Sequence, residues 1–307
     1  MGFLYFLEDL RMPGLNEFML GITNFGDEIA FLAIALILFW CVDKRRGYYV
    51  MAVGFFGTLA NQFLKITCRI PRPWVRDSHF TILEQARETA GGYSFPSGHT
   101  QNGVGTFGAV AVTTKDKLIK GFCVALMILV PLSRMYIGVH TPADVLVAAG
   151  MALGMIVLMK GVVYSNDGKY IPVMLWVGLG LSVSYLAYVE LFPFPADVDA
   201  DNLYSAVENA YTLLGALSGM LVVDHVDRKW LNFKTDAVWW AQILKFFAGL
   251  AVVLAVKEGM SVPLDLVFSG HMIARGILYF LVVIVAGVVW PLTFPWFSRL
   301  GNKEEKV

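Results

Sequence analysis

The sequence carries little charge for its length. Of its 307 residues only 16% are Asp, Glu, Lys or Arg, whereas 57% are hydrophobic. A water-soluble domain usually has about a quarter charged residues, and a disordered chain has far less apolar surface than this one. The shortage of charge therefore excludes intrinsic disorder and argues against a globular enzyme in water.

Net charge and cysteine are also scarce. The 24 basic and 24 acidic side chains cancel, so no overall positive field would attract nucleic acid. The three cysteines, Cys41, Cys68 and Cys123, have no paired spacing, which argues against a disulfide framework and against a zinc site. The N-terminus lacks the basic segment of a signal peptide, and we expect no cleavage there.

The hydrophobic residues are gathered in long runs, and the mean hydropathy of the chain is +0.63. A membrane span needs about 20 mostly apolar residues. By that measure the strong candidates are residues 27–43, 47–66, 120–139, 143–164, 171–192, 208–224, 237–256 and 272–295. A weaker candidate, residues 99–114, is rich in Gly, Thr, Asn and Gln, which favours a helix buried against its neighbours. The sequence thus predicts an all-α, polytopic transmembrane helix bundle.

The basic residues predict the orientation of these spans. With the N-terminus outside, most Lys and Arg side chains fall on the cytoplasmic side, as the positive-inside rule requires. A basic cluster between Lys65 and Arg87, together with Arg134, falls on the opposite side, and we interpret it as a binding site. We expect an integral protein of a bacterial plasma membrane with an extracytoplasmic site, although a eukaryotic endoplasmic reticulum with a lumenal site satisfies the same rule.

Three polar segments lie on that extracytoplasmic side. In chain order they read K-x6-R-P over 65–73, P-S-G-H over 96–99 and S-R-x5-H-x3-D over 133–144. Lys65, Arg72 and Arg134 would offer three positive charges, and guanidinium groups match phosphate oxygens well. Ser97 and Gly98, at the start of a helix, would add a hydroxyl and backbone N–H donors. Together these residue types predict a phosphate site.

Two histidines beside a phosphate predict divided roles. His140 is the better nucleophile, because Thr141 and Pro142 predict a helix start whose third residue, Asp144, reaches back towards the imidazole. That carboxylate would fix the tautomer and leave the other ring nitrogen free to attack phosphorus. His99 would protonate the leaving oxygen and later activate water. Because Asp144 is the only carboxylate in these segments, we expect no metal and no cofactor.

Each segment also has a purely structural interpretation. Residues 141–144 can cap a helix without catalysis, and residues 96–98 can be an ordinary loop-to-helix junction. Lys65 and Arg72 can simply extend to the membrane surface. The occurrence of all three segments in one order and on one membrane side favours the phosphate site.

The three segments match the signature of the type 2 phosphatidic acid phosphatase superfamily without a mismatch, and the chain resembles it over about residues 15–164. This superfamily also includes bacterial acid phosphatases, glucose-6-phosphatases and vanadium haloperoxidases. The resemblance implies an all-helical core in which phosphate is bound by Lys65, Arg72, Ser97, Gly98 and Arg134. It also implies His140 as nucleophile, Asp144 as its partner and His99 as general acid.

The predicted organisation has three parts. Residues 1–26 form amphipathic helices at the membrane interface, with a re-entrant hairpin as the alternative. Residues 27–164 form a phosphatase core of about six helices, and residues 165–307 add three or four C-terminal spans. This extension is similar to the longer architecture of sphingosine-phosphate phosphatases and of some bacterial lipid phosphatases.

We expect a metal-independent hydrolase that removes phosphate from a lipid phosphate or diphosphate through a phosphohistidine. Undecaprenyl diphosphate, phosphatidic acid, phosphatidylglycerol phosphate and a sphingoid-base phosphate all fit. The aromatic and apolar loop 74–95 is equally consistent with a lipid-entry lid and with a packed cover over the site. A phosphotransferase using the same site and a non-enzymatic lipid or anion transporter stay open, although no inverted repeat is visible.

Overall fold

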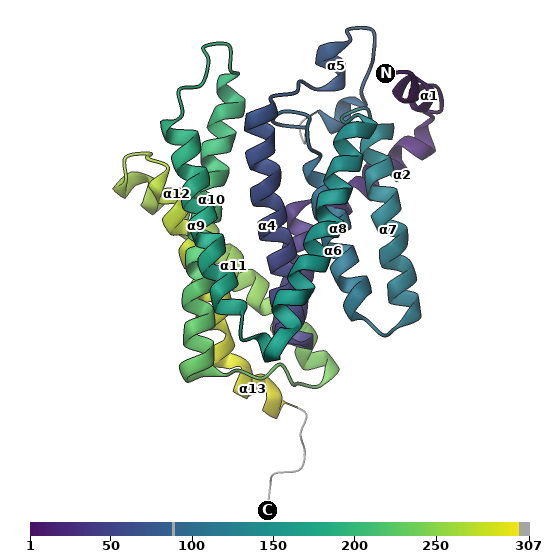
Figure 1. Ribbon diagram of the computed structural model, residues 1–307. Helices are drawn as coiled ribbons and strands as arrows, with labels where there is room; N and C mark the ends of the chain where they lie inside the picture. Colours follow the sequence, from purple (N-terminus) through teal and green to yellow (C-terminus); the bar gives the residue numbers. More distant parts are fainter. Residues whose placement is uncertain (88–89, 301–307) are drawn as a thin grey trace, which may run out of the picture. The chain divides into compact units, whose positions relative to one another are not determined.

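The computed structural model describes residues 1–87 and 90–300, and these are helical along most of their length (Figure 1). The α-helices are α1 (Gly2–Asp9), α2 (Pro13–Thr23), α3 (Glu28–Ile37), α4 (Lys44–Cys68), α5 (Pro73–Arg76), α6 (Gly98–Thr113), α7 (Lys117–Tyr136), α8 (Pro142–Tyr164), α9 (Ile171–Leu191), α10 (Ala200–Val226), α11 (Trp239–Val267), α12 (Ile273–Ile284) and α13 (Phe294–Arg299). Neither described range contains a strand. The predicted all-α fold is confirmed.

Six helical segments of the described chain are long and apolar enough to cross a membrane. They are Lys117–Tyr136, Pro142–Gly168, Ile171–Leu191, Ala200–Leu231, Trp239–Val267 and Ile273–Arg299. A pair of helices bent by 54°, Pro13–Gly26 and Glu28–Val42, passes the same test together. The predicted span 27–43 is therefore the second arm of a broken segment, and the polytopic prediction is confirmed.

The two remaining predicted spans are helices as well. Residues 47–66 lie within α4, and residues 99–114 nearly coincide with α6. Most side chains of α6 are buried, from Thr100 to Ala111, as its small and polar residues predict. The polar helix is packed inside protein rather than exposed along its length.

The chain divides into two compact units. The first comprises Met1–Ile34, Tyr49–Gly161 and Pro193–Ala206, and it contains all three polar segments. The second comprises Ala35–Tyr48, Val162–Phe192 and Val207–Val307, of which residues 301–307 lie outside the described residues. The three-part organisation and the interfacial position of residues 1–26 stay predictions.

Helix packing in the first unit converges on α6 and α7. These two helices pack along each other, and α2 and the short 3-10 turn η1 (Asn24–Gly26) pack on them. Side-chain caps fix the helix starts, because Ser97 Oγ accepts a hydrogen bond from the Thr100 amide and Asp116 accepts from two amides of α7. The P-S-G-H segment is thus held at the first turn of α6.

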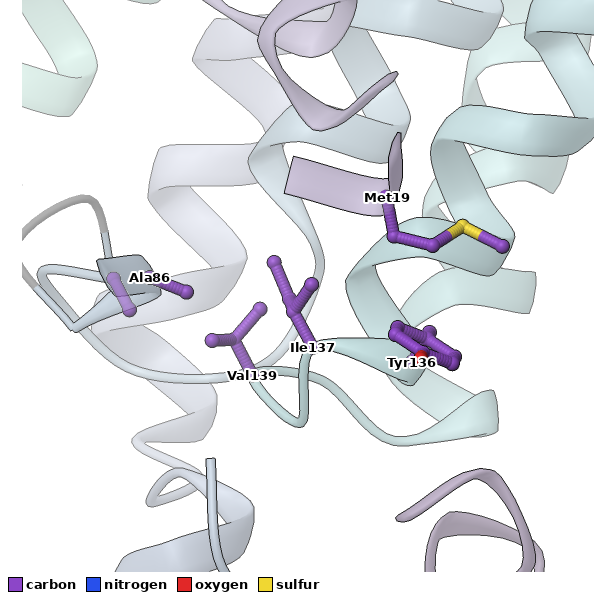
Figure 2. Close-up of a cluster of buried hydrophobic side chains, with 6 residues drawn as sticks. Met19, Ala86, Tyr136, Ile137 and Val139 are labelled. Carbon is purple, nitrogen blue, oxygen red and sulfur yellow. The ribbon is translucent and has the colours of Figure 1, made fainter. Parts of the chain in front are cut away.

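The loop between α4 and α6 is packed against its surroundings. One buried cluster, shown in Figure 2, contains Met19, Ala86, Ala90, Tyr136, Ile137 and Val139. Phe80 and Ile82 are buried with Leu4 of α1 in a second cluster. The Leu83 amide also donates to the Ile137 carbonyl at 3.1 Å. The described residues of loop 74–95 therefore pack against α1, α2 and the turn leading to His140, which favours the packed-cover interpretation.

The second unit is built around α11, which packs against α12 and α13. Gly215 of α10 lies against the backbone of Gly276 in α12, so these helices cross with no side chain between them. Lys245 of α11 is fully buried, and its Nζ donates to the Thr235 carbonyl at 3.0 Å.

Candidate active site

His140 lies buried in the turn between α7 and α8, with a charged group on each side of its ring. Arg72 Nη1 is 2.9 Å from Nε2, and Asp144 Oδ2 is 3.6 Å from Nδ1. Arg72 is 6% exposed and Asp144 is 1% exposed. The fold thus brings the expected nucleophile together with its expected carboxylate partner and one expected phosphate-binding residue.

Asp144 is held at the first turn of α8. Its Oδ2 accepts from the Thr141 amide at 2.7 Å, and its own amide donates to Thr141 Oγ1 at 3.3 Å. This is the reciprocal capping arrangement that the sequence predicts for residues 141–144. The same Oδ2 accepts from Ser94 Oγ at 2.6 Å. At 3.6 Å the contact between Asp144 Oδ2 and His140 Nδ1 is longer than a hydrogen bond.

Ser94 is a residue that sequence reasoning missed. It is fully buried, and its amide donates to the Ile70 carbonyl at 2.8 Å. A serine in a loop has no helical or strand spacing to mark it, and its nearness to the P-S-G-H segment is the only signal that could have identified it. Its hydroxyl links the loop between the first two segments to Asp144 of the third.

Backbone carbonyls of the same loop hold two of the expected phosphate-binding cations. Arg72 Nε donates to the Gly92 carbonyl at 3.1 Å, and its Nη2 donates to the Gly91 carbonyl at 2.6 Å. Lys65 Nζ donates to the Tyr93 carbonyl at 2.8 Å. These contacts direct both cations towards the loop that precedes the P-S-G-H segment.

Arg134 is fully buried and only partly paired. Its Nη1 donates to Thr23 Oγ1 at 2.7 Å. Within the described part of the chain, its Nε and Nη2 have no hydrogen-bond partner. Leaving charged donors buried and unpaired is costly, so these N–H groups are suited to receive an anion.

The P-S-G-H segment joins the other two at the start of α6. The Ser97 amide donates to the Asp144 carbonyl at 3.1 Å, which connects the second segment to the third. A Cβ placed on Gly98 would meet no atom within 4 Å, so the backbone there faces open space. His99 Nε2 lies 3.3 Å from Asp27 Oδ1, a contact that sequence reasoning missed because Asp27 lies outside the three segments.

The electrostatics favour a neutral His140 among cations. Burial lowers the pKa of His140 well below its usual value, and the charges of Arg72, Arg134 and Lys65 lower it further. Burial also lowers the pKa of Arg72 to about 10, against the opposing effect of Asp144, so this guanidinium stays charged at neutral pH. A neutral imidazole is the form that attacks phosphorus.

The donor set around His140 suits an anion. Among the described residues, three cations and one buried carboxylate leave an excess of positive charge, which is costly unless a negative group pairs with it. In residues 1–87 and 90–300, no group of three or more His, Cys, Asp or Glu side chains could hold a metal ion. The arrangement therefore suits an anion such as phosphate beside the expected nucleophile.

Two family models match the chain. Residues 45–167 match the PAP2 superfamily, and residues 211–303 match a model described as the transmembrane extension of PAP2 superfamily phosphatases. The first range contains all eight residues that the sequence assigns to the site, whereas Thr23 and Asp27 precede it.

Curated bacterial proteins are similar to the same region. The chain is 29% identical over 167 residues to phosphatidylglycerophosphatase B of Bacillus subtilis, and the aligned region covers 50% of the chain and 77% of that protein. It is 28% identical over 137 residues to undecaprenyl-diphosphatase BcrC of B. subtilis, and the aligned region covers 43% of the chain and 68% of that protein. It is 32% identical over 149 residues to decaprenylphosphoryl-5-phosphoribose phosphatase of Mycobacterium tuberculosis, covering 46% and 76%. No solved structure shows a significant match.

These matches confirm the resemblance drawn from the three polar segments. The family models, the phosphatase relatives and the apolar helices of spanning length agree with one another. The chain therefore belongs to the PAP2 superfamily, as an integral membrane lipid phosphatase that carries the family's transmembrane extension.

Proposed function

We propose that this chain hydrolyses a lipid phosphate or diphosphate without a metal, through a phosphohistidine on His140. The observation that carries the proposal is the buried His140 surrounded by Lys65, Arg72 and Arg134, with Asp144 as the one buried carboxylate beside it among the described residues. A phosphate supplies the negative charge that this cluster lacks.

The reaction would proceed in two steps at one phosphorus atom. Arg72 Nη1 exchanges its contact with His140 Nε2 for a phosphate oxygen, which frees the nitrogen lone pair. A P–N bond forms as the P–O bond to the leaving group breaks, and His99 gives its proton to the leaving oxygen. Water then attacks phosphorus, His99 takes a proton from that water, and phosphate leaves as His140 is regenerated.

The substrate class follows from the relatives and from the membrane setting. The relatives are named for phosphatidylglycerophosphate, for an undecaprenyl diphosphate and for a decaprenylphosphoryl phosphoribose. Phosphatidic acid and a sphingoid-base phosphate carry the same reacting group on a lipid. Because the relatives are bacterial, we place the chain in a bacterial plasma membrane, with the site on the extracytoplasmic face that the basic residues predict.

The test is a phosphate-release assay of the purified protein over these lipid phosphates, with His140→Ala compared with His79→Ala, a change at an exposed loop histidine. Wild type and His79→Ala should release phosphate, and His140→Ala should lose at least about 1000-fold in rate. Labelled substrate should leave an acid-labile, base-stable phosphoryl group on wild type and on His79→Ala, and none on His140→Ala. Undiminished release by a correctly inserted His140→Ala protein would refute the mechanism.

The same assay separates hydrolysis from phosphotransfer. Adding an acceptor lipid alcohol should leave the yield of inorganic phosphate unchanged if water is the acceptor. Conversion of the alcohol to a new lipid phosphate, with a matching loss of inorganic phosphate, would instead favour a phosphotransferase.

A further inference from the structure

A short turn that precedes the residues matched by the family model also contacts the site. It comprises residues 23–27, at the bend between α2 and α3. Asp27 Oδ1 lies 3.3 Å from His99 Nε2, and Thr23 Oγ1 lies 2.7 Å from Arg134 Nη1. One turn therefore contacts both the expected general acid and an expected phosphate-binding residue.

The backbone of this turn fixes the approach of Asp27. A Cβ placed on Gly26 would lie 2.7 Å from the His99 carbonyl oxygen and 3.0 Å from the His99 Cβ, so the backbone contact requires a residue without a side chain. The Asp27 carbonyl also accepts from the Phe31 amide at 3.1 Å, which anchors the residue at the start of α3. The carboxylate is thus held beside His99 by two backbone constraints.

The charges around His99 indicate a role for the Asp27 carboxylate. A general acid must hold a proton, yet burial and the charges of Arg134 and Arg72 disfavour the imidazolium form of His99. The side chain of His99 is 16% exposed, so water screens those charges only partly. A carboxylate at 3.3 Å stabilises the imidazolium and orients the ring.

We infer that Asp27 is a positioning residue for His99, an inference that rests on the proposed phosphatase chemistry. Asp27 accepts the Nε2–H of His99 and leaves the Nδ1–H to be donated. As the P–O bond breaks, that proton passes to the leaving oxygen and the ring becomes neutral, still bonded to Asp27. In the second step Nδ1 takes a proton from the attacking water. Each histidine of the site then has its own carboxylate, Asp27 for His99 and Asp144 for His140.

The test exploits the leaving group, because only a poor one needs a proton from His99. Asp27→Asn is compared with wild type on a lipid phosphate, whose alkoxide leaves poorly, and on p-nitrophenyl phosphate, whose phenolate leaves unaided. We expect kcat on the lipid phosphate to fall about 10- to 100-fold with KM unchanged, within the range that general acids contribute. On the aryl phosphate the rate should change less than about twofold.

Three comparisons exclude a merely structural effect. Asp9→Asn, at an exposed carboxylate of α1, should match wild type on both substrates. Asp27→Glu keeps the carboxylate and should recover part of the lost rate, and Asp27→Ser, which also removes the carboxylate, replaces Asp27→Asn in the comparison if that protein folds poorly. In a His99→Ala background Asp27→Asn should cause no further loss, because the two residues act as a unit.

Two results would overturn the inference. One is an equal loss on both substrates, which indicates general distortion of the site, and the other is no loss on either. Failure of the wild type to release phosphate from both substrates would instead reject the proposed function, so the two failures are distinguishable.

Discussion

At the scale of single residues, Arg72 and His140 share one hydrogen-bonding position at the centre of the site. A guanidinium can only donate, so the 2.9 Å contact from Arg72 Nη1 leaves the lone pair of His140 on Nε2 and the proton on Nδ1. Nδ1 faces Asp144. The geometry thus selects the tautomer that attack from Nε2 requires, with the lone pair covered by Arg72.

The lowered pKa of His140 predicts how activity depends on pH. The neutral ring is the form that the proposed attack requires, so a lower pKa keeps His140 reactive at more acidic pH and moves the acid limb of kcat/KM to lower pH. In Arg72→Gln one of the lowering charges is lost, so that limb should move to higher pH while the rate also falls. Rates on one substrate measured from pH 4 to 8 test this, since the ionisation of the substrate is common to both proteins. An unchanged or lower midpoint in Arg72→Gln would contradict the assignment.

Some of these residues could be predicted from the sequence and others could not, for a physical reason. The capping arrangement of Thr141 and Asp144 is local, so its spacing predicts it. The contacts of Ser94 with Asp144 and of Asp27 with His99 join residues far apart in the chain. Such contacts depend on how helices pack, which no local pattern encodes.

At the scale of elements, two helix starts converge on the site. α6 begins at Gly98 and α8 begins at Pro142, and the Ser97 amide joins them through the Asp144 carbonyl. The N-terminus of a helix carries partial positive charge and unpaired N–H groups. The start of α6, where Gly98 faces open space, therefore adds to the attraction of the cations for the proposed phosphate, whereas the start of α8 is already capped by Thr141 and Asp144.

Helix packing in the second unit predicts opposite effects for two matched substitutions. Gly215→Ala would place a Cβ against the Gly276 backbone, which cannot move aside, and should destabilise the fold by about 1–3 kcal/mol. Gly180→Ala, on the exposed surface of α9 with no atom within 4 Å, should stabilise its helix by up to about 1 kcal/mol. Thermal unfolding in detergent measures both, and a stabilised Gly215→Ala protein would disprove the close crossing.

Hydropathy located the helices better than it located their ends. α10 and α11 extend past the predicted spans 208–224 and 237–256, to Ala200 and Val267, because helices continue through polar residues that an apolar window omits. By contrast, the predicted span 272–295 is a regular α-helix only as far as Ile284, and the helix changes its hydrogen-bonding pattern between Ile284 and Pro291. A proline cannot supply the amide that a regular helix needs there.

At the scale of the whole molecule, the catalytic unit is larger than the family match. The match begins at residue 45, yet Arg11 of the N-terminal region donates to the Tyr136 carbonyl at 3.1 Å and Asp27 reaches His99. The bent segment at the N-terminus is thus part of the site's framework. Composition alone predicts that it is apolar, and only the fold shows what it contacts.

The uneven distribution of basic residues predicts which membrane face carries the activity. Right-side-out vesicles should hydrolyse a membrane-impermeant aryl phosphate without detergent, whereas inverted vesicles should do so only after permeabilisation. Detergent-treated samples of each preparation give the total activity for comparison. Greater activity in intact inverted vesicles would reverse the proposed topology.

The position of Asp144 makes the thermal stability of the active site depend on one helical turn, the first turn of α8. Its Oδ2 receives the Thr141 amide and the Ser94 hydroxyl while facing His140. Fraying at the start of α8 would release all three groups together, and helix ends open with far less free energy than a whole fold. Heating would therefore inactivate the enzyme reversibly before the bundle melts, so catalysis reports on the first turn of α8 well before spectroscopy detects unfolding.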